Sequence, residues 1–310
     1  MQFKTAALVL MTVCAATGCK KKGGGGTGGG GGWLVGQQGM MANVGTDGQL
    51  RDGYDLGSTE TLTGIACKGL ETAYVVGEHG TMLRTTDSGE SWDSLDIGTA
   101  ATLRSVAASD THMVYAVGDG VFVSSPDDGD SWRSVADGNV ASWRAVTADW
   151  RGSIALAISD DGRVWRYAGS SAQHRATLLG ARTIALSHDG AAAVAVGDGV
   201  WRSLDGGLTW ASLDVGPVEL NDAWIAGDGR IIAVGDTGSI LNIAVDGTPT
   251  LAFPGEKNLR SVHIAADGFG MAGGDDGEVL ISRDGGRTWK PGPNVGQTVL
   301  ALDQIGADHL

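Results

Sequence analysis

The chain has few cysteines, and its globular part has few cationic side chains. Cys14 lies in an apolar leader and Cys19 at its end, so Cys67 stands alone and a disulfide framework is excluded. We expect Cys67 to be a buried structural thiol. All 36 acidic residues follow position 32, but only 18 of the 22 basic residues do, which gives this part a net charge of −18. Such a surface excludes nucleic acid as a partner, because phosphate binding requires positive charge.

Membrane-spanning runs and the common catalytic motifs are also missing. The apolar stretch 6–16 is too short to span a bilayer. The sequence contains no Gly-x-Ser-x-Gly nucleophile turn, and its six histidines show no metal-ligand spacing. Its Asp-Gly turns lack the alternating oxygen ligands of a dedicated calcium loop. We therefore expect no catalytic residues, no metal and no cofactor.

The first 32 residues predict export and tethering. Residues 1–18 combine an early lysine with a short apolar stretch, as in a signal peptide. The small residues before Cys19 resemble a bacterial lipobox, in which that cysteine is lipidated; ordinary secretion with cleavage at a small residue is the alternative. Residues 19–32 then form a Lys- and Gly-rich tether that spans roughly 20 Å as a flexible coil. The expected location is the cell envelope, at the outer membrane, periplasm or cell surface.

One pattern repeats through residues 33–310 with a period near forty. Its first landmark is a glycine turn after a short apolar strand, and successive copies lie 38 to 41 residues apart. Each copy holds short segments that are rich in β-branched and aromatic residues and bounded by Gly, Asp or Ser, as is typical of four antiparallel strands. This period predicts an all-β, seven-bladed β-propeller. The seven turn positions are Gly36, Gly77, Gly118, Ser159 in a lapsed copy, Gly197, Gly235 and Gly274.

The second landmark is the Asp-box or BNR pattern, S/T-x-D-x-G-x-S/T-W, which occurs four times between the third and fourth strands of a repeat. Its aspartate can accept backbone N–H groups of the turn, its glycine tolerates a left-handed conformation, and its tryptophan can pack between sheets. We interpret these boxes as structural hairpins. Their residues are Asp87, Gly89, Trp92, Asp127, Gly129, Trp132, Asp205, Gly207, Trp210, Asp284, Gly286 and Trp289.

Six complete blades and two leftover ends account for the repeats. The segment that starts at Trp33 supplies a second and a third strand, whereas residues 297–310 supply only a first strand. We expect the two ends to share the seventh blade, because this closes the ring and removes free sheet edges. The complete blades are expected at 61–98, 101–138, 140–180, 181–216, 217–255 and 256–296.

Aligning the first strands places one position in register through all blades. First strands line the channel of a propeller, so these side chains are expected around one mouth, on the face opposite the Asp boxes. The arginines could clamp a carboxylate of a partner, or pair with aspartates of the neighbouring turns. Both interpretations remain open. The seven residues are Thr63, Arg104, Arg144, Arg182, Asn221, Arg260 and Leu300, of which the four arginines and Asn221 are the candidate binding residues.

The segments VYAVGDG, IIAVGDTG and AYVVGEHGTMLRTTDSGESW, with LRSV in first strands, resemble the photosystem II stability and assembly factor family of seven-bladed propellers. The resemblance covers residues 33–310. It implies a non-catalytic, photosynthesis-related assembly role in which a protein or peptide, such as a membrane-protein precursor, is held by a basic patch. By position, that patch corresponds to Arg104, Arg144, Arg182 and Arg260. We expect a monomer that reaches the membrane through its lipid anchor.

The alternative is a sialidase-like glycoside hydrolase or a carbohydrate-binding Asp-box propeller. Sialidases resemble one another in an Arg-Ile-Pro segment before the first box, a three-arginine carboxylate clamp, and a tyrosine paired with a glutamate. This sequence contains no Arg-Ile-Pro, and its four tyrosines have no evident glutamate partner. The sequence therefore favours a binding protein over an enzyme.

Overall fold

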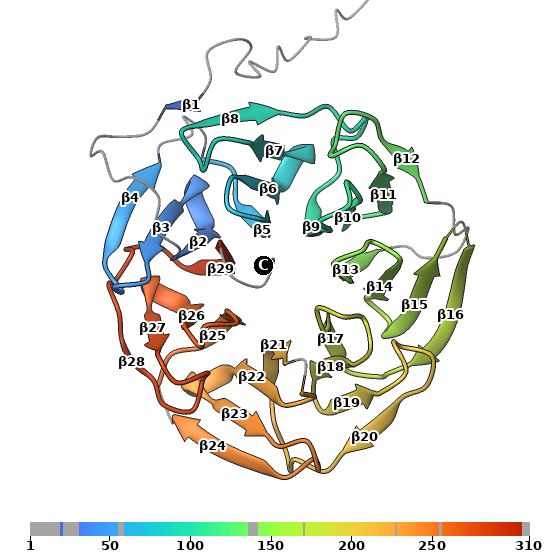
Figure 1. Cartoon of the computed structure of the whole chain (residues 1–310), viewed down its shortest axis with the longest axis vertical. Helices are drawn as coiled ribbons and strands as arrows, with labels where there is room; N and C mark the ends of the chain where they lie inside the picture. Colours follow the sequence, from blue (N-terminus) through green and yellow to red (C-terminus); the bar gives the residue numbers. More distant parts are fainter. Residues whose placement is uncertain are drawn as a thin grey trace, which may run out of the picture.

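The computed structural model describes residues 19–20, 31–54, 59–135, 142–169, 171–226, 228–253 and 256–305 (Figure 1). The predicted signal peptide (1–18), most of the predicted tether (21–30) and the last five residues lie outside the described residues. In the described part of the chain, no helix has the length and apolar character that crossing a membrane requires.

Seven antiparallel sheets stand around a central channel, which confirms the predicted seven-bladed propeller (Figure 1). Six blades consist of four consecutive strands each, from the channel outward. Blades 1 and 2 contain β5 (Leu62–Lys68), β6 (Thr72–Gly77), β7 (Met82–Thr85), β8 (Ser91–Ser94), β9 (Leu103–Ala108), β10 (Val114–Gly118), β11 (Val121–Ser125) and β12 (Arg133–Ser134). Blades 3 and 4 contain β13 (Trp143–Ala148), β14 (Ile154–Ser159), β15 (Arg163–Ala168), β16 (Ser171–Thr177), β17 (Ala181–Leu186), β18 (Ala193–Gly197), β19 (Val200–Ser203) and β20 (Ala211–Leu213). Blades 5 and 6 contain β21 (Leu220–Ile225), β22 (Ile231–Gly235), β23 (Ile240–Ile243), β24 (Pro249–Phe253), β25 (Leu259–Ile264), β26 (Gly270–Gly274), β27 (Val279–Ser282) and β28 (Lys290–Pro291).

The seventh blade joins the two ends of the chain, as predicted. Its strands run in the order β29 (Val299–Ile305), β2 (Gly31–Gly36), β3 (Met41–Gly45) and β4 (Leu50–Tyr54). Leu302 of the last strand stands opposite Leu34 of β2, and Figure 1 shows β29 between β2 and the channel. The ring is therefore closed by hydrogen bonds between segments almost 270 positions apart in the sequence. In addition, β1 (Cys19–Lys20) pairs with the outer edge of β8.

The last two glycines of the predicted tether are part of the seventh blade. A Cβ atom at Gly31 would lie 2.3 Å from the carbonyl oxygen of Val44, and one at Gly32 would lie 1.8 Å from Cε of Met271. The contact at Gly31 is with backbone, so this position requires glycine for close packing, whereas a side chain at Gly32 would have to displace the flexible end of Met271. The blade thus begins two residues before Trp33.

The core lies between blades rather than inside any one of them. The second strand of each blade has a neighbouring sheet on both of its faces, and β10, β18, β22 and β26 are buried at every residue. The junction of blades 6 and 7 is representative: Leu34 and Val44 pack with Phe269 and Met271 of the preceding blade. This two-sided burial explains why the second strands are continuous apolar runs instead of alternating patterns.

In four blades, a short 3₁₀ turn connects the second strand to the third. Each turn contains one non-glycine residue at a φ of 55 to 57°, followed by a glycine that is also left-handed. The glycines whose spacing marks the repeat, such as Gly36 and Gly77, are extended and stand just before these turns. That spacing therefore locates the turns but does not reveal the two left-handed residues inside each of them. The turns are η1 (Gln37–Gly39), η2 (Glu78–Gly80), η3 (Asp236–Gly238) and η4 (Asp275–Gly277).

Side chains of the inner strands form hydrogen bonds from blade to blade. An inner strand has a strand partner on one edge, so N–H groups on its other edge need acceptors elsewhere. The Oγ of Ser105 accepts the N–H of Val146 in the next blade at 3.2 Å. At the ring closure, a carboxylate oxygen of Asp303 accepts the N–H of Cys67 at 2.7 Å. The predicted burial of Cys67 is confirmed, and that burial raises the pKa of its thiol.

Two leucines of β29 predict unequal costs for the same truncation. Leu302 is buried against blade 6, whereas Leu300 is partly exposed on the channel wall. We expect Leu302→Ala to lower the free energy of unfolding by about 2 to 5 kcal/mol, and Leu300→Ala by less than about 1 kcal/mol. Urea unfolding of both variants measures the difference. Equal losses would contradict the packing of β29 as the inner strand of the seventh blade.

Candidate functional site

The structure places all seven in-register positions of the first strands on the wall of one cavity. This cavity is the central channel, and its volume is about 300 Å³. Hydroxyl groups of the inner strands line it below the arginines. The seven positions around the mouth are Thr63, Arg104, Arg144, Arg182, Asn221, Arg260 and Leu300.

The mouth lies on the face that carries the turns between second and third strands. The N–H of Asp119 bonds the carbonyl of Thr102, just before β9, and the N–H of Asp275 bonds that of Asn258, just before β25. These turn aspartates therefore lie beside the arginines at the beginning of each first strand. The Asp-box hairpins contact the other end of the blade, where the N–H of Ser88 bonds the carbonyl of Glu71.

A chain of ion pairs crosses the mouth from blade 2 to blade 3. Arg104 donates to Asp119 at 2.7 Å and to both carboxylate oxygens of Asp160 at 3.0 and 3.2 Å. Asp160 also accepts from Nε of Arg144 at 2.9 Å. Arg104 thus binds the turn aspartate of its own blade and that of the next one.

Arg182, Asn221 and Arg260 bind the turn aspartates of their own blades. Two of them also reach the next blade, because Arg182 lies 3.8 Å from Glu219 and Asn221 donates to the carbonyl of Leu259 at 2.9 Å. Arg182 lies 2.7 Å from Asp198, and Arg260 makes two bonds with Asp275 at 2.9 and 3.2 Å. The hydrogen bonds from Arg260 hold the pKa of Asp275 below its ordinary value. Asn221 donates to Asp236, the turn aspartate of the same blade, at 2.8 Å.

The arginines nevertheless keep hydrogen-bonding capacity. Among the described residues, Arg144 uses only Nε and Arg182 only one terminal nitrogen in ion pairs. The four guanidinium side chains are between 34% and 40% exposed. A carboxylate that enters the mouth can therefore bind the free nitrogens or displace a turn aspartate, because exposed ion pairs of this kind cost little to exchange. The two interpretations of the arginines are compatible in this geometry.

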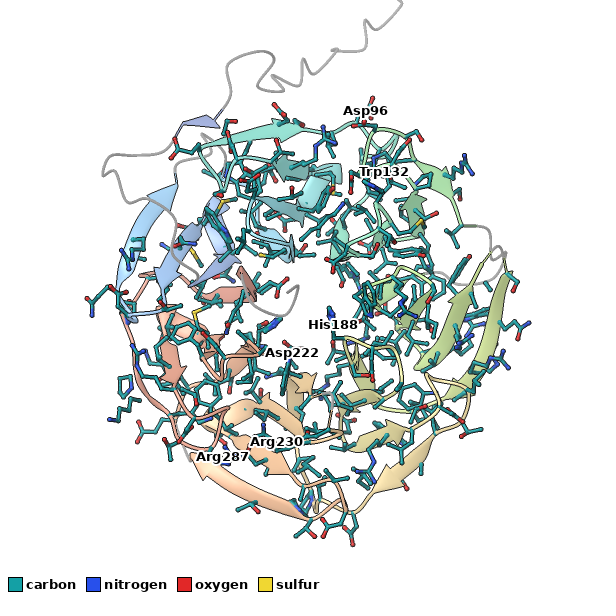
Figure 2. All side chains as sticks on the ribbon, viewed as in Figure 1. Asp96, Trp132, His188, Asp222, Arg230 and Arg287 are labelled. Atoms are coloured by element: carbon teal, nitrogen blue, oxygen red, sulfur yellow. The ribbon has the colours of Figure 1, made fainter. Side chains whose placement is uncertain are left out.

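Asp222 is a titratable group on the channel wall that no motif in the sequence indicates. Figure 2 shows it beside the channel. Its carboxylate accepts the N–H of Val262 at 3.0 Å and the hydroxyl of Ser261 at 2.9 Å, so it links blade 5 to blade 6. Burial raises the pKa of Asp222 to about 6, despite these hydrogen bonds. The sequence pattern does not reveal this link, because the partners of Asp222 lie 39 and 40 residues away in the next blade.

The four Asp-box segments share the hydrogen bonds of their aspartate and glycine. In three of them the indole N–H of the tryptophan also binds the glycine carbonyl, whereas Trp92 packs edge-on against Trp33. In the second box, Asp127 accepts the N–H and the hydroxyl of Ser131 at 2.8 and 2.6 Å, and Gly129 donates its N–H to Ser125. The side-chain bond from Ser131 lowers the pKa of Asp127 to about 2. Trp132 donates its indole N–H to the carbonyl of Gly129 at 3.0 Å. Every acceptor of this carboxylate is thus used inside the hairpin, which suits a structural role.

A second function of one box is to join two blades. Asp128, the residue after the box aspartate, is left-handed with a φ of 58° and pairs with Lys68 and His112. The hydroxyl of Tyr74, which is fully buried in blade 1, donates to the carbonyl of Asp128 at 2.9 Å. The neighbouring Asp128 and the burial of Tyr74 raise the pKa of this phenol. The sequence pattern does not reveal this network, because its members are up to 60 residues apart.

One group of three potential metal ligands occurs in the described part of the chain. Ligand atoms of Glu60, Glu78 and His79 lie within 4.8 Å of one another. His79 bonds Glu60 at 2.6 Å, and Glu78 accepts the N–H of Thr61. Each of the three groups thus has a hydrogen-bond partner within the protein.

Two tryptophans near Arg144 in the sequence do not contribute to the mouth. Trp143 is buried and packs against Phe122 with ring centroids 5.1 Å apart. Trp150 follows the far end of β13 and stacks on His188 with ring centroids 5.9 Å apart. Apolar contact from these residues at the mouth is therefore absent.

The raised pKa of Asp222 predicts a specific pH dependence. The folded state holds the Asp222 proton more tightly than the unfolded chain does. The contribution of this group to the free energy of unfolding is therefore most favourable below about pH 4 and is lost as the pH rises through 6. We expect Asp222→Asn to gain stability relative to the parent protein between pH 4 and 7, by up to about 3 kcal/mol.

Asp246→Asn is the matched control, because backbone bonding to Thr248 lowers the pKa of Asp246. Because the Asp246 carboxylate is ionised in both the folded and the unfolded chain above about pH 5, the stability of this variant relative to the parent protein should stay constant between pH 5 and 7 and change only at lower pH. Urea unfolding at a series of pH values measures both differences. A difference for Asp222→Asn that does not change with pH would contradict the assignment.

No protein-family model matches the sequence, and no curated protein matches it either. Solved structures do. YCF48 bound to a D1 peptide is 21% identical over 77% of this chain and 84% of that chain, with a TM-score of 0.62. YCF48 from Cyanidioschyzon merolae is 16% identical over 76% and 86%, with a TM-score of 0.61. A nidogen–laminin complex matches at 9% identity over 89% and 98%, with a TM-score of 0.59. The chain thus has the propeller fold of the YCF48 assembly factors.

Proposed function

We propose that the chain is a non-catalytic propeller that binds a protein or peptide at its arginine-bearing mouth. The observation that carries this proposal is the placement of four arginines, in register, around one open end of the channel. A structural neighbour, YCF48, has been solved with a peptide of D1, and an assembly role for this chain agrees with that likeness.

The contacts at the mouth suggest how a partner binds. Arg144 and Arg182 lie on adjacent blades and keep free terminal nitrogens among the described residues. Guanidinium groups bind carboxylates through two parallel hydrogen bonds, so a side-chain or terminal carboxylate of an extended peptide fits between them. Leu179, which precedes Arg182 in the chain and is 76% exposed, offers an apolar contact next to this position. An acidic residue beside an apolar one is the peptide chemistry that these groups favour.

The proposed location is the cell envelope, with Cys19 as the lipidated residue. The lipobox-like sequence and the Lys- and Gly-rich segment support this proposal. A tethered monomer would present its channel mouth to a membrane-associated partner. Metabolic labelling with an alkyne-bearing fatty acid tests the anchor, because Cys19→Ser should abolish the label.

The sialidase alternative finds no support in the positions of the tyrosines. The hydroxyl of Tyr74 is hydrogen-bonded to Asp128 between blades 1 and 2, and Tyr115 is buried. Tyr167 packs on Phe122 with ring centroids 5.0 Å apart. None of these three described tyrosines lies on the channel wall. A fluorogenic sialoside tests this point, and turnover by the purified chain would overturn the non-catalytic assignment.

The binding proposal predicts an effect of the mouth arginines that other surface arginines do not share. Arg104→Ala combined with Arg144→Ala should leave the thermal unfolding midpoint nearly unchanged, because exposed ion pairs contribute little to stability. The amount of partner captured by this variant should be lower than that captured by the parent chain by a factor of about ten or more. Affinity capture from membranes of the source cells, followed by mass spectrometry, identifies proteins held by the parent chain and lost by the variant.

Arg133→Ala is the control for that capture. Arg133 is exposed on β12, the outer strand of blade 2, far from the channel. It should retain the same partners as the parent chain. Equal recovery with the mouth variant and the parent chain would contradict the mouth as the binding site.

A further inference from the structure

Most of the large apolar side chains that are exposed in the described part of the chain lie on one face of the ring. Of these six side chains, four stand in turns between first and second or between third and fourth strands. First strands begin at the channel mouth, so these turns lie at the opposite end of the blades, which we call the Asp-box face. The propeller itself does not cover this apolar surface. The four residues are Leu70, Leu204, Leu208 and Val245, and they are between 41% and 67% exposed.

Three of these side chains come from adjacent hairpins of blades 4 and 5. The guanidinium of Arg202, two residues before Leu204, donates to the carbonyl of Val245. This bond holds the turn of blade 5 against the end of β19, so Val245 stands beside the Asp box of blade 4. The box of blade 4 is also the only one of the four that is apolar at the position of Leu208. The other three boxes have a charged residue there, namely Glu90, Asp130 and Arg287.

A partly exposed tryptophan lies in the neighbouring turn of blade 3. The ring of Trp150 stacks on His188 of blade 4, which Figure 2 shows near the channel. The guanidinium of the exposed Arg151 lies 4.5 Å from the centroid of the same ring. The turn that carries His188 also touches the box of blade 4, because the N–H of Gly206 bonds the carbonyl of Ala191. Tryptophan, arginine and leucine together are typical of protein surfaces that lie in the headgroup region of a bilayer.

The chain enters the propeller at this same face. Strand β2 runs from Gly31 toward the mouth, so Gly31 lies at the Asp-box end of blade 7, where it pairs with Gly45. Cys19 stands opposite Trp92, the last residue of the first Asp box, on the outer edge of blade 1. Both ends of the predicted tether thus lie at the Asp-box end of the ring. A lipid on Cys19 would therefore bring this face, rather than the mouth, next to the bilayer.

From these observations we infer that the Asp-box face rests on a lipid bilayer, with Leu204, Leu208, Val245 and Trp150 at the interface. The contact is apolar, because residues 33–310 have a net charge of −18 and are repelled by anionic lipid. The inference rests on the proposed lipidation of Cys19 for the orientation of the chain, whereas the exposed side chains support it independently. The mouth then faces away from the lipid at a distance of about 20 Å, the length of a six-residue strand. It is open to a segment of a partner that projects from the membrane.

Vesicle binding by an unlipidated chain tests the inference separately from the anchor. Residues 19–310 with Cys19→Ser are sedimented with vesicles of phosphatidylcholine. We expect binding that added salt does not weaken and that phosphatidylglycerol in the vesicles does, because the acidic domain repels anionic lipid. Hydrogen exchange should become slower in 186–191, 203–209 and 244–248 when vesicles are present, and the turns at the mouth should not change.

Two leucine variants of the same chain complete the test. Leu204→Ser with Leu208→Ser should lower the affinity for the vesicles at least about tenfold, because two exposed apolar side chains are lost from the contact. Leu179→Ser, the same change on the mouth side, should bind vesicles as the parent chain does. Thermal unfolding verifies that both variants fold.

Three results would overturn the inference: no binding of the parent chain to the vesicles, an equal loss in both leucine variants, or slower exchange only in the turns at the mouth. A dimer that forms with rising protein concentration and is lost in the double variant alone would also overturn it. In that case a second copy of the chain, and not lipid, would cover the Asp-box face.

Discussion

Hydrogen bonds between the inner strands of neighbouring blades are the constraint on which the ring depends. Each inner strand has a free edge toward the channel, and side chains of the adjacent blade satisfy part of it. Ser105, Asp222 and Asp303 each accept an N–H of the next blade in this way. The bond from Asp303 to Cys67 is special because it joins the last strand to blade 1, while the same strand pairs with β2. Apolar packing between blades supplies the bulk of the stability, and these bonds fix where one blade stands relative to the next.

The repeat explains how much of this architecture could be predicted. A glycine turn near every fortieth residue sets the number of blades, and the unequal ends of the repeat indicate the shared blade. The start of that blade could not be predicted, because Gly31 and Gly32 have the composition of the tether and only their packing against Val44 and Met271 places them in the blade. The mouth could be placed because strand alternation is regular. The ion pairs of Arg104 with two different turns, and the raised pKa of Asp222, depend on distances between blades, which no repeat pattern contains.

The channel mouth gathers basic side chains in a domain that is acidic as a whole. At the mouth, arginines lie among turn aspartates, and within the described part of the chain Arg144 and Arg182 each use one guanidinium nitrogen in ion pairs.

Amide hydrogen exchange of the inner strands tests the closed ring most directly. The N–H groups of Cys67 and Val262 have side-chain acceptors in neighbouring blades rather than strand partners at that edge. The account predicts that both amides exchange as slowly as those inside the blades, and that Asp303→Ala releases Cys67 while leaving Val262 protected. If Cys67 exchanged at the rate of a solvent-exposed amide in the unmodified protein, the ring would not be closed as described.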